Sequence, residues 1–320
     1  MIDNFLIVAQ QVAILFVLMG FGAAMRKAGF FKDSAIDGIV NVLLLVVTPC
    51  LIVDVFQRPF DSSMLKGLGL AFVIASLVHV VLIALARLVV RHRDEDVRRP
   101  LLLAAVFSNA GFMGVPLEQA VLGDEGVFYG IVYVVVFNLF MWSWGLRTMC
   151  GEGMRDQGSG IMRRGMSLKM WVNPGTAGIA LGLPLFFCSV KLPAVIGVPI
   201  HHMANLNTPL AMIVIGYALA GAEFGKVLRT GTVYVATFIR LVVSPLLVIA
   251  ALYPFRHALD RNMMLAMTVA ASAPVAAMVS MFAAKFKRDV DVSVAVVSGT
   301  TLLSILTMPV VIALAMGVLP

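Results

Sequence analysis

The chain alternates between long apolar runs and short polar connections, and this pattern predicts a helical membrane protein. Each run holds about 20 residues almost free of charge, which is the length that crosses a hydrocarbon core as an α-helix. The ten runs cover residues 5–25, 35–55, 67–90, 101–122, 126–149, 173–190, 204–222, 232–253, 262–284 and 291–317. We therefore expect an all-α polytopic protein with ten transmembrane helices.

Two of these runs are interrupted in the middle. The run Leu101–Gly123 carries Asn109 and Pro116 near its centre, and the run Asn262–Phe286 is interrupted at residues 272–274. Lipid cannot hydrogen-bond a loosened backbone, so such breaks persist only where protein shields them or a polar cavity faces them. Interrupted spans at matching positions in two halves of a chain are typical of the binding site of a secondary transporter.

Prolines recur at matching intervals in the two halves. Pro49 and Pro116 lie 67 residues apart, and Pro209 and Pro274 lie 65 residues apart. With five spans in each half, the second copy enters the membrane from the opposite side, which predicts an inverted repeat. The alternative is that these prolines reflect only the general frequency of proline in membrane helices.

The longest polar connection divides the chain into these halves. We expect the first five-helix repeat at residues 1–150, a cytoplasmic linker at 151–170 and the second, inverted repeat at 171–320. The first apolar run is too long for the core of a signal peptide, and no basic residue precedes it, so we interpret it as a retained helix. No separate soluble domain is expected.

Composition agrees with a membrane protein and charge orients it. Hydrophobic residues make up 61% of the chain and charged residues 13%, with a mean hydropathy of +0.99, against about 25% charged in soluble domains. Of 24 Lys and Arg residues, eighteen lie in or beside the connections after odd-numbered spans and five after even-numbered spans. The positive-inside rule then predicts a multi-pass protein of the bacterial cytoplasmic (inner) membrane with both termini periplasmic. The basic residues sit in short connections, so a nucleic-acid partner is not expected.

Several motifs resemble one known family over essentially the whole chain. The most specific is FSNAGFMGVPL at residues 107–117. Further matching positions are Gly126, Asn138, Asn173-Pro174, Thr208-Pro209-Leu210, Arg240 with Ser244-Pro245, and SGTTLLS at 298–304. Together they resemble the auxin efflux carrier family, which comprises plant auxin exporters and bacterial permeases for malonate, malate and related organic acids. The short central connection is closer to the bacterial permeases.

The resemblance implies a fold like that of sodium–proton antiporters and bile acid symporters. Its elements are ten spans in two inverted five-helix repeats, with broken helices four and nine crossing one another. A homodimer through the static bundle is also implied. No cofactor is expected beyond a coupling H⁺ or Na⁺, and no metal site, since His201-His202 have too few ligands nearby.

The breaks themselves favour an anionic ligand. Each leaves unpaired N–H groups at the start of its second half-helix, where the macrodipole carries partial positive charge. Pro116 and Pro274 suit the first turn of those half-helices. Asn109 can donate to a carboxylate, and Ser272 is its expected counterpart in the second half. We therefore expect a small carboxylate substrate bound where the two broken spans meet.

The remaining candidates surround these breaks. The full set of expected substrate-binding residues is Ser108, Asn109, Gly111, Gly114, Pro116, Ser272, Pro274, Thr48, Asn138, Thr300, Thr301 and Ser304. The two glycines would let a ligand approach the backbone closely. The alternative for the hydroxyl side chains is that they hydrogen-bond their own helix or a neighbouring one, as is usual inside membranes.

Two residues are candidates for ion coupling. Glu118 follows Pro116 and is either intramembrane, where an ionisable residue indicates function, or placed near the surface with Asp124 and Glu125. His79 lies in the middle of the third span and titrates near neutrality unless packing perturbs it; the alternative is a packing histidine. Arg240, within an apolar run, either snorkels to the interface or balances buried carbonyl groups.

These observations favour a secondary active transporter of small organic anions, working by alternating access of an elevator or rocking type. The alternatives are a membrane-embedded enzyme or a channel. An enzyme would need a nucleophile–base pair or a carboxylate–metal cluster, and no such motif occurs. Channels often carry rings of pore-lining charge. The chain also lacks a phosphate-binding glycine-rich loop with lysine, so ATP is not the expected energy source.

Overall fold

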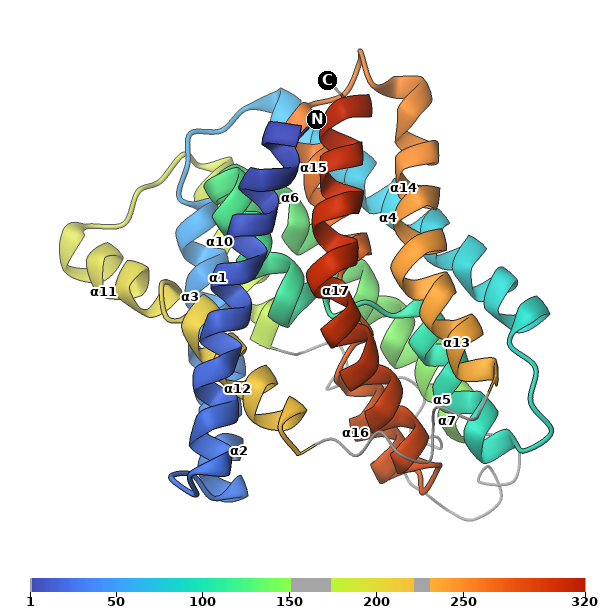
Figure 1. Ribbon diagram of the computed structural model, residues 1–320. Coiled ribbons are helices and arrows are strands. Elements are labelled where there is room, and N and C mark those ends of the chain that lie inside the picture. The colour runs from blue at the N-terminus through green and yellow to red at the C-terminus, as the bar shows by residue number, and fades with distance from the viewer. Residues whose placement is uncertain (1, 151–173, 222–230, 320) are drawn as a thin grey trace.

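The computed structural model describes residues 2–150, 174–221 and 231–319, and these form a bundle of helices (Figure 1). The first elements are α1 (Ile2–Lys27), α2 (Asp33–Val42), the π-helix η1 (Leu43–Val47), α3 (Thr48–Phe56) and α4 (Ser62–Val89). Elements α2, η1 and α3 follow one another without interruption. Pro49 lies in the first turn of α3, where its missing N–H changes the hydrogen-bond register.

The first interrupted run forms a helix, a break and a hairpin. Its elements are α5 (Glu95–Val106), the π-helix η2 (Ala110–Gly114), α6 (Val115–Phe140), the π-helix η3 (Met141–Gly145) and α7 (Leu146–Cys150). Gly123 interrupts α6 with φ 67° and ψ −157°, a region open essentially to glycine alone. The chain reverses direction at Gly123. As a result, the carboxyl of Glu118 lies directly against Gly130. The two arms, 115–122 and 124–140, therefore pack side by side.

The second half of the chain forms ten further elements in the described residues. They are α10 (Pro174–Phe187), α11 (Ala194–Ala204), α12 (Asn207–Leu219), α13 (Gly231–Phe238), the π-helix η6 (Ile239–Val243), α14 (Ser244–Leu252), the 3₁₀ turn η7 (Tyr253–Phe255), α15 (Arg261–Ser272), α16 (Met278–Lys285) and α17 (Val290–Val318). The expected linker at 151–170 lies outside the described residues.

Six helical stretches in the described part of the chain are long and apolar enough to cross a membrane. The interrupted run at α15 and α16 does not reach that length as one helix, because its break divides it. A polytopic helical membrane protein is therefore confirmed, while the full set of ten spans stays a prediction.

One connection expected after the sixth span is a helix. Residues 194–204 form α11, with Pro199 inside it and His201-His202 in its last turn. A proline in the second turn removes one intrahelical hydrogen bond. The apolar residues around it still form the helix, which projects from the side of the bundle (Figure 1).

Helices α1 and α12 make an unusually close contact. A Cβ atom added at Gly22 would lie 2.1 Å from the carbonyl oxygen of Ile213, and one at Gly216 would lie 1.9 Å from that of Met19. Small residues let membrane helices approach until their backbones touch, which maximises dispersion contacts where lipid offers no hydrophobic driving force. Any larger residue at either glycine would push the pair apart.

A cluster of buried apolar residues joins this pair to the interrupted spans. It contains residues of α1, η1 and α12 on one side and of η2, α6, α15 and α17 on the other. Four methionines lie in it: Met19, Met113, Met212 and Met308. Methionine side chains are flexible and fill irregular gaps. We call this cluster the methionine seam.

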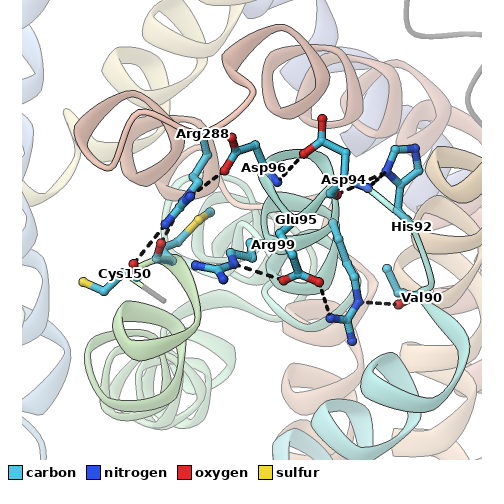
Figure 2. Close-up of polar contacts among 10 residues, drawn as sticks. Val90, His92, Asp94, Glu95, Asp96, Arg99, Cys150 and Arg288 are labelled. Carbon is cyan, nitrogen blue, oxygen red and sulfur yellow. Dashed lines mark hydrogen bonds and ion pairs between the residues drawn. The ribbon is translucent and has the colours of Figure 1, made fainter. Parts of the chain in front are cut away.

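In the connection between α16 and α17, Arg288 ties three segments together (Figure 2). Its guanidinium lies 2.5 Å from an Asp96 carboxylate oxygen at the start of α5. It also donates to the carbonyl oxygens of Met149 and Cys150, at 2.9 Å each, where α7 ends. Cations are favourable at such carbonyl ends, so the contact anchors the end of the fifth span against the broken spans.

Candidate functional site at the two breaks

The breaks in the two interrupted runs contact each other through their backbones. Ser108 and Val275 form an isolated antiparallel bridge. The N–H of Asn109 donates to the carbonyl of Pro274 at 2.6 Å, and that of Ala276 donates to Phe107 at 3.0 Å. Each extended segment thus satisfies polar groups of the other, as the membrane interior requires. The two broken spans meet where the sequence predicts.

Arg240 in η6 binds the carbonyl ends of both first half-helices. It is fully buried and donates to the carbonyl oxygen of Val106 at 2.7 Å, at the end of α5. A second nitrogen donates to the carbonyl oxygen of Ala271 near the end of α15 and to the Ser244 hydroxyl. Helix C-termini carry partial negative charge, and one guanidinium compensates two of them. Of the two roles considered for Arg240, balance of buried carbonyl groups is the one observed.

The first break opens onto a cavity. The backbone N–H groups at the start of η2 have no partner earlier in the helix, and Gly111 and Phe112 of η2 line a cavity of about 130 Å³. Its polar lining consists of Thr48, Asn138, Asn207 and the Gly111 backbone; the other lining residues are Leu, Ile, Val and Phe. We call it the apolar cavity.

The second break is closed by its neighbours. The N–H of Val275 donates to the Thr300 hydroxyl at 3.1 Å, and the Ser272 hydroxyl donates to the carbonyl of Val269 in its own helix. Neither Ser272 nor Pro274 lines the apolar cavity. The expected symmetry between Asn109 and Ser272 therefore does not extend to exposure toward this cavity.

The residues around Asn109 differ in their surroundings. Asn109 is 7% exposed, and its carboxamide has no hydrogen-bond partner among the described residues. The Ser108 hydroxyl is buried, and no hydrogen-bond partner for it lies in the described part of the chain. Gly114 packs against Ala270 of α15, and Pro116 lies in the first turn of α6. Asn109 is thus at the break, next to the cavity-lining η2, but is not itself part of the cavity wall.

The other expected polar residues bond mainly within their own helices. Thr48 donates to Leu43 and Asn138 to Val134, and both also line the apolar cavity. The hydroxyls of Thr301 and Ser304 donate to carbonyl groups of α17. Thr300 does the same while accepting from the second break. The local hydrogen-bonding alternative holds for these hydroxyls, and Thr300 has a structural role as well.

Glu118 is fully buried. Both carboxyl oxygens lack a hydrogen-bond partner among the described residues and lie against the bare backbones of Gly114 and Gly130. Asp124 and Glu125 are exposed, so Glu118 does not group with them. An ionised carboxylate without a partner is costly to bury, so Glu118 is set apart from the exposed carboxylates by its surroundings.

His79 packs among aromatic rings. It stacks on Phe140 with ring centres 5.3 Å apart and lies close to Tyr133 and Phe107. Its Nδ1 is 2.8 Å from the carbonyl of Ala75, while Nε2 has no partner in the described residues. This environment is that of a packing histidine.

A second, smaller cavity adjoins the first and contains residues that sequence reasoning missed. It holds about 70 Å³, shares Asn207 with the apolar cavity, and is lined by Asp54 and Asp124. His201 Nδ1 lies 2.8 Å from the Asp54 carboxylate. We call it the acidic cavity. In the sequence, only the position of Asn207 directly before the Thr208-Pro209 pair marks it as a candidate. In the parts of the chain that the structure describes, no group of three His, Cys, Asp or Glu side chains is placed to hold a metal.

Comparisons with known proteins identify the family of this chain. The family described as membrane transport protein matches residues 7–312. An uncharacterised transporter of Methanothermobacter thermautotrophicus is 26% identical over 305 residues, covering 94% of this chain and 96% of the relative. An uncharacterised transporter of Methanocaldococcus jannaschii is 24% identical over 308 residues, covering 92% and 94%. The chain therefore belongs to the membrane transport protein family, the family of auxin efflux carriers that its motifs resemble.

Proposed function

We propose that this transporter is a secondary active carrier of a small organic anion, such as malonate, malate or an auxin-like carboxylate. The observation that carries the proposal is the unequal treatment of helix ends at the crossing. Arg240 compensates two carbonyl ends, while the N–H end of η2 faces a cavity. The positive helix end left for a ligand favours an anion.

Two kinds of helix contact support alternating access of the elevator type. The α1–α12 pair is held by backbone-to-backbone contact at its glycines and serves as the static part. The methionine seam is the apolar contact between this pair and the interrupted spans. Flexible side chains can repack as one surface slides past another, so the seam is the surface along which the interrupted spans move.

Membrane topology completes the proposal. Ten spans form two inverted repeats, at residues 1–150 and 171–320, in the cytoplasmic membrane, with both termini on the outer side. The static part forms a homodimer. The excess of basic residues in alternate connections supports the orientation.

Glu118 carries the coupling proton. Its buried carboxyl without a partner is stable only when neutral, so conformational exposure to water would release the proton. Replacing Glu118 with Gln should preserve substrate exchange at equal pH and abolish its response to a pH gradient.

Reconstituted liposomes test the function. Labelled malonate, malate and indole-3-acetate are supplied with and without a pH gradient, and uptake is corrected with protein-free liposomes because weak acids leak through lipid. We expect saturable uptake of at least one anion, stimulated by the gradient. The variant Asn109→Ala should lose most of it.

Absence of protein-dependent flux for every anion under either gradient would refute the carrier proposal. Unaltered transport by Asn109→Ala would remove that side chain from the site. Channel function, which no observation favours, would show as flux that never saturates with substrate.

A further inference from the structure

Three phenylalanine rings from three helices meet beyond the apolar cavity. The centre of the Phe128 ring in α6 lies 4.9 Å from that of Phe56, at the end of α3, and 5.3 Å from that of Phe186, near the end of α10. The rings of Phe56 and Phe186 are 6.3 Å apart and complete the triangle. All three residues are buried, with at most 2% of each exposed. We call them the phenylalanine cluster.

The phenylalanine cluster continues the wall of the apolar cavity along the same helix faces. Each of the three helices contributes an isoleucine to that wall, and these are Ile52, Ile131 and Ile179. In α3 the phenylalanine follows the isoleucine by four residues, in α6 it precedes it by three, and in α10 it follows it by seven. Residues at these spacings lie on one face of an α-helix. The rings therefore cover the cavity one to two helical turns beyond its wall.

The three rings come from two different parts of the bundle. Helix α3 continues from η1, which lies with α1 and α12 in the methionine seam, and α10 packs along α3. Helix α6 belongs to the hairpin of the first interrupted span. Phe128 is therefore a side chain of the moving part, held between two rings of the static part. Aromatic pairs at these distances attract one another beyond the burial of their surface.

Arg58, in the connection between α3 and α4, holds the Phe128 ring from one side. Its Nε donates to the carbonyl oxygen of Val55 at 2.8 Å, which fixes the side chain to α3. Its Nη2 donates to the carbonyl oxygen of Asp124 at 3.2 Å, directly after the turn at Gly123. The guanidinium carbon lies 4.6 Å from the centre of the Phe128 ring, and a cation over an aromatic face is attracted to it. One side chain thus joins static α3 to the tip of the moving hairpin.

The tip of that hairpin is held in shape by the moving part itself. Gln119 donates to the Asp124 carboxylate at 2.9 Å, so Arg58 contacts a tip that is already fixed. The acidic cavity lies elsewhere, because its wall residue Asp54 is two positions from Phe56 and points from a different face of α3. Arg58 and the phenylalanine cluster therefore close only the side formed by α3, α6 and α10.

We propose that Phe128 is a gate of this transporter and that Arg58 holds the gate closed. The gate presupposes the proposed alternating access and names the contacts that must break when one end opens. Opening withdraws the Phe128 ring from the phenylalanine cluster and separates Arg58 from the hairpin tip. These residues lie at the ends of even-numbered spans and in the connections after them, which are on the outer side in the orientation that the basic residues favour.

Labelling of a cysteine inside the apolar cavity tests the gate without any substrate. The background is the full-length protein with its three native cysteines replaced by alanine, namely Cys50, Cys150 and Cys188. Ile131→Cys then supplies a single thiol in the cavity wall. A membrane-impermeant maleimide is added to intact bacterial cells, which expose the outer side, and to inside-out membrane vesicles, which expose the inner side.

Loss of the gate should shift the population toward the conformation that is open to the outside. We expect Phe128→Ala to raise the labelling rate in intact cells at least about 5-fold, and Arg58→Ala to raise it about 2-fold, since weakening one state raises the share of the other. The rate in inside-out vesicles should not rise.

The matched control is Phe187→Ala, at the rim of the same cluster. Phe187 is half-exposed and contacts the rings of Phe60 and Phe186, but no ring contact with Phe128 occurs among the described residues. This variant should leave the labelling rate unchanged. Thermal unfolding in detergent confirms that each variant is folded, and Phe128→Leu together with Arg58→Ala carries the test if Phe128→Ala does not fold.

Three results would overturn the gate. They are an unchanged rate in a folded Phe128 variant, an equal rise in Phe187→Ala, and a rise in inside-out vesicles. Liposome flux decides anion transport separately, so either proposal can fail while the other stands.

Discussion

The first break faces a cavity, whereas the second is closed by hydrogen bonds. In the first, Gly111 and Phe112 line open space. In the second, the Thr300 hydroxyl occupies the Val275 N–H, and Ser272 bonds its own helix. Two segments of similar pattern thus have different surroundings, one facing a cavity and the other closed against its neighbours. The sequence pattern predicts where the breaks lie but not which one faces the cavity.

The largest effect is expected from Arg240→Leu, because that side chain serves both breaks at once. Removing it leaves two buried carbonyl ends without their charged donor, which costs about 3 kcal/mol or more. We expect a clear loss of folded protein and a lower thermal unfolding midpoint in detergent. The unfolding midpoint of Arg240→Lys should lie between those of the wild type and Arg240→Leu, since an ammonium lacks the planar fork that reaches both carbonyl groups.

The control is Arg91→Leu, an exposed arginine that donates to Leu88 three residues earlier. If Arg240→Leu unfolds at the same temperature as this control, the two carbonyl ends do not depend on the guanidinium.

Thr300→Val tests the second break alone. It leaves the buried Val275 N–H without an acceptor, which should cost about 1–3 kcal/mol. Chemical or thermal denaturation measures this. The matched variant Thr301→Val removes a neighbouring hydroxyl that bonds only its own helix in the described residues, so it should cost less. Equal losses would contradict the special role of Thr300.

Gly111→Ala tests the first break alone. The new methyl would have Val134 Cγ1 at 4.0 Å as its nearest neighbour, so stability should hardly change. It would enter the apolar cavity beside the η2 N–H groups and weaken carboxylate binding about 5-fold, which corresponds to about 1 kcal/mol. Titration calorimetry measures the change, with Gly69→Ala as control because open space surrounds that glycine too. Unchanged affinity would separate Gly111 from the ligand.

The smallest effect is expected from Ser272→Ala. Its hydroxyl donates to a carbonyl of the same helix. Loss of such a local side-chain-to-backbone hydrogen bond should have little effect, so the transport rate should stay within about twofold of wild type. A large loss of flux at unchanged stability would restore the symmetric interpretation of the two breaks.

Local sequence predicted the helical class and both break positions, because Asn, Gly and Pro disfavour an uninterrupted apolar helix. It could not specify the partners at the breaks. Arg240 and Thr300 reach them from more than 20 residues away in the chain. The position of Asn207 between the two cavities depends on helix packing as well. Such contacts leave no periodic signal in one sequence. Helix α11 is not predicted for a different reason, since it lies between two expected spans and Pro199 disfavours a helix interior.

The reversal at Gly123 has a mechanical consequence. One residue joins the two arms of α6, so their relative sliding is limited to about the reach of a single residue, roughly 3.5 Å. The apolar cavity takes wall residues from η2 before the turn and from Ile131 to Asn138 after it. The other wall residues come from η1, α3, α10 and α12. The hairpin therefore supplies one side of the cavity as a preassembled piece, while the opposite side belongs to helices that are not tied to it by the turn at Gly123.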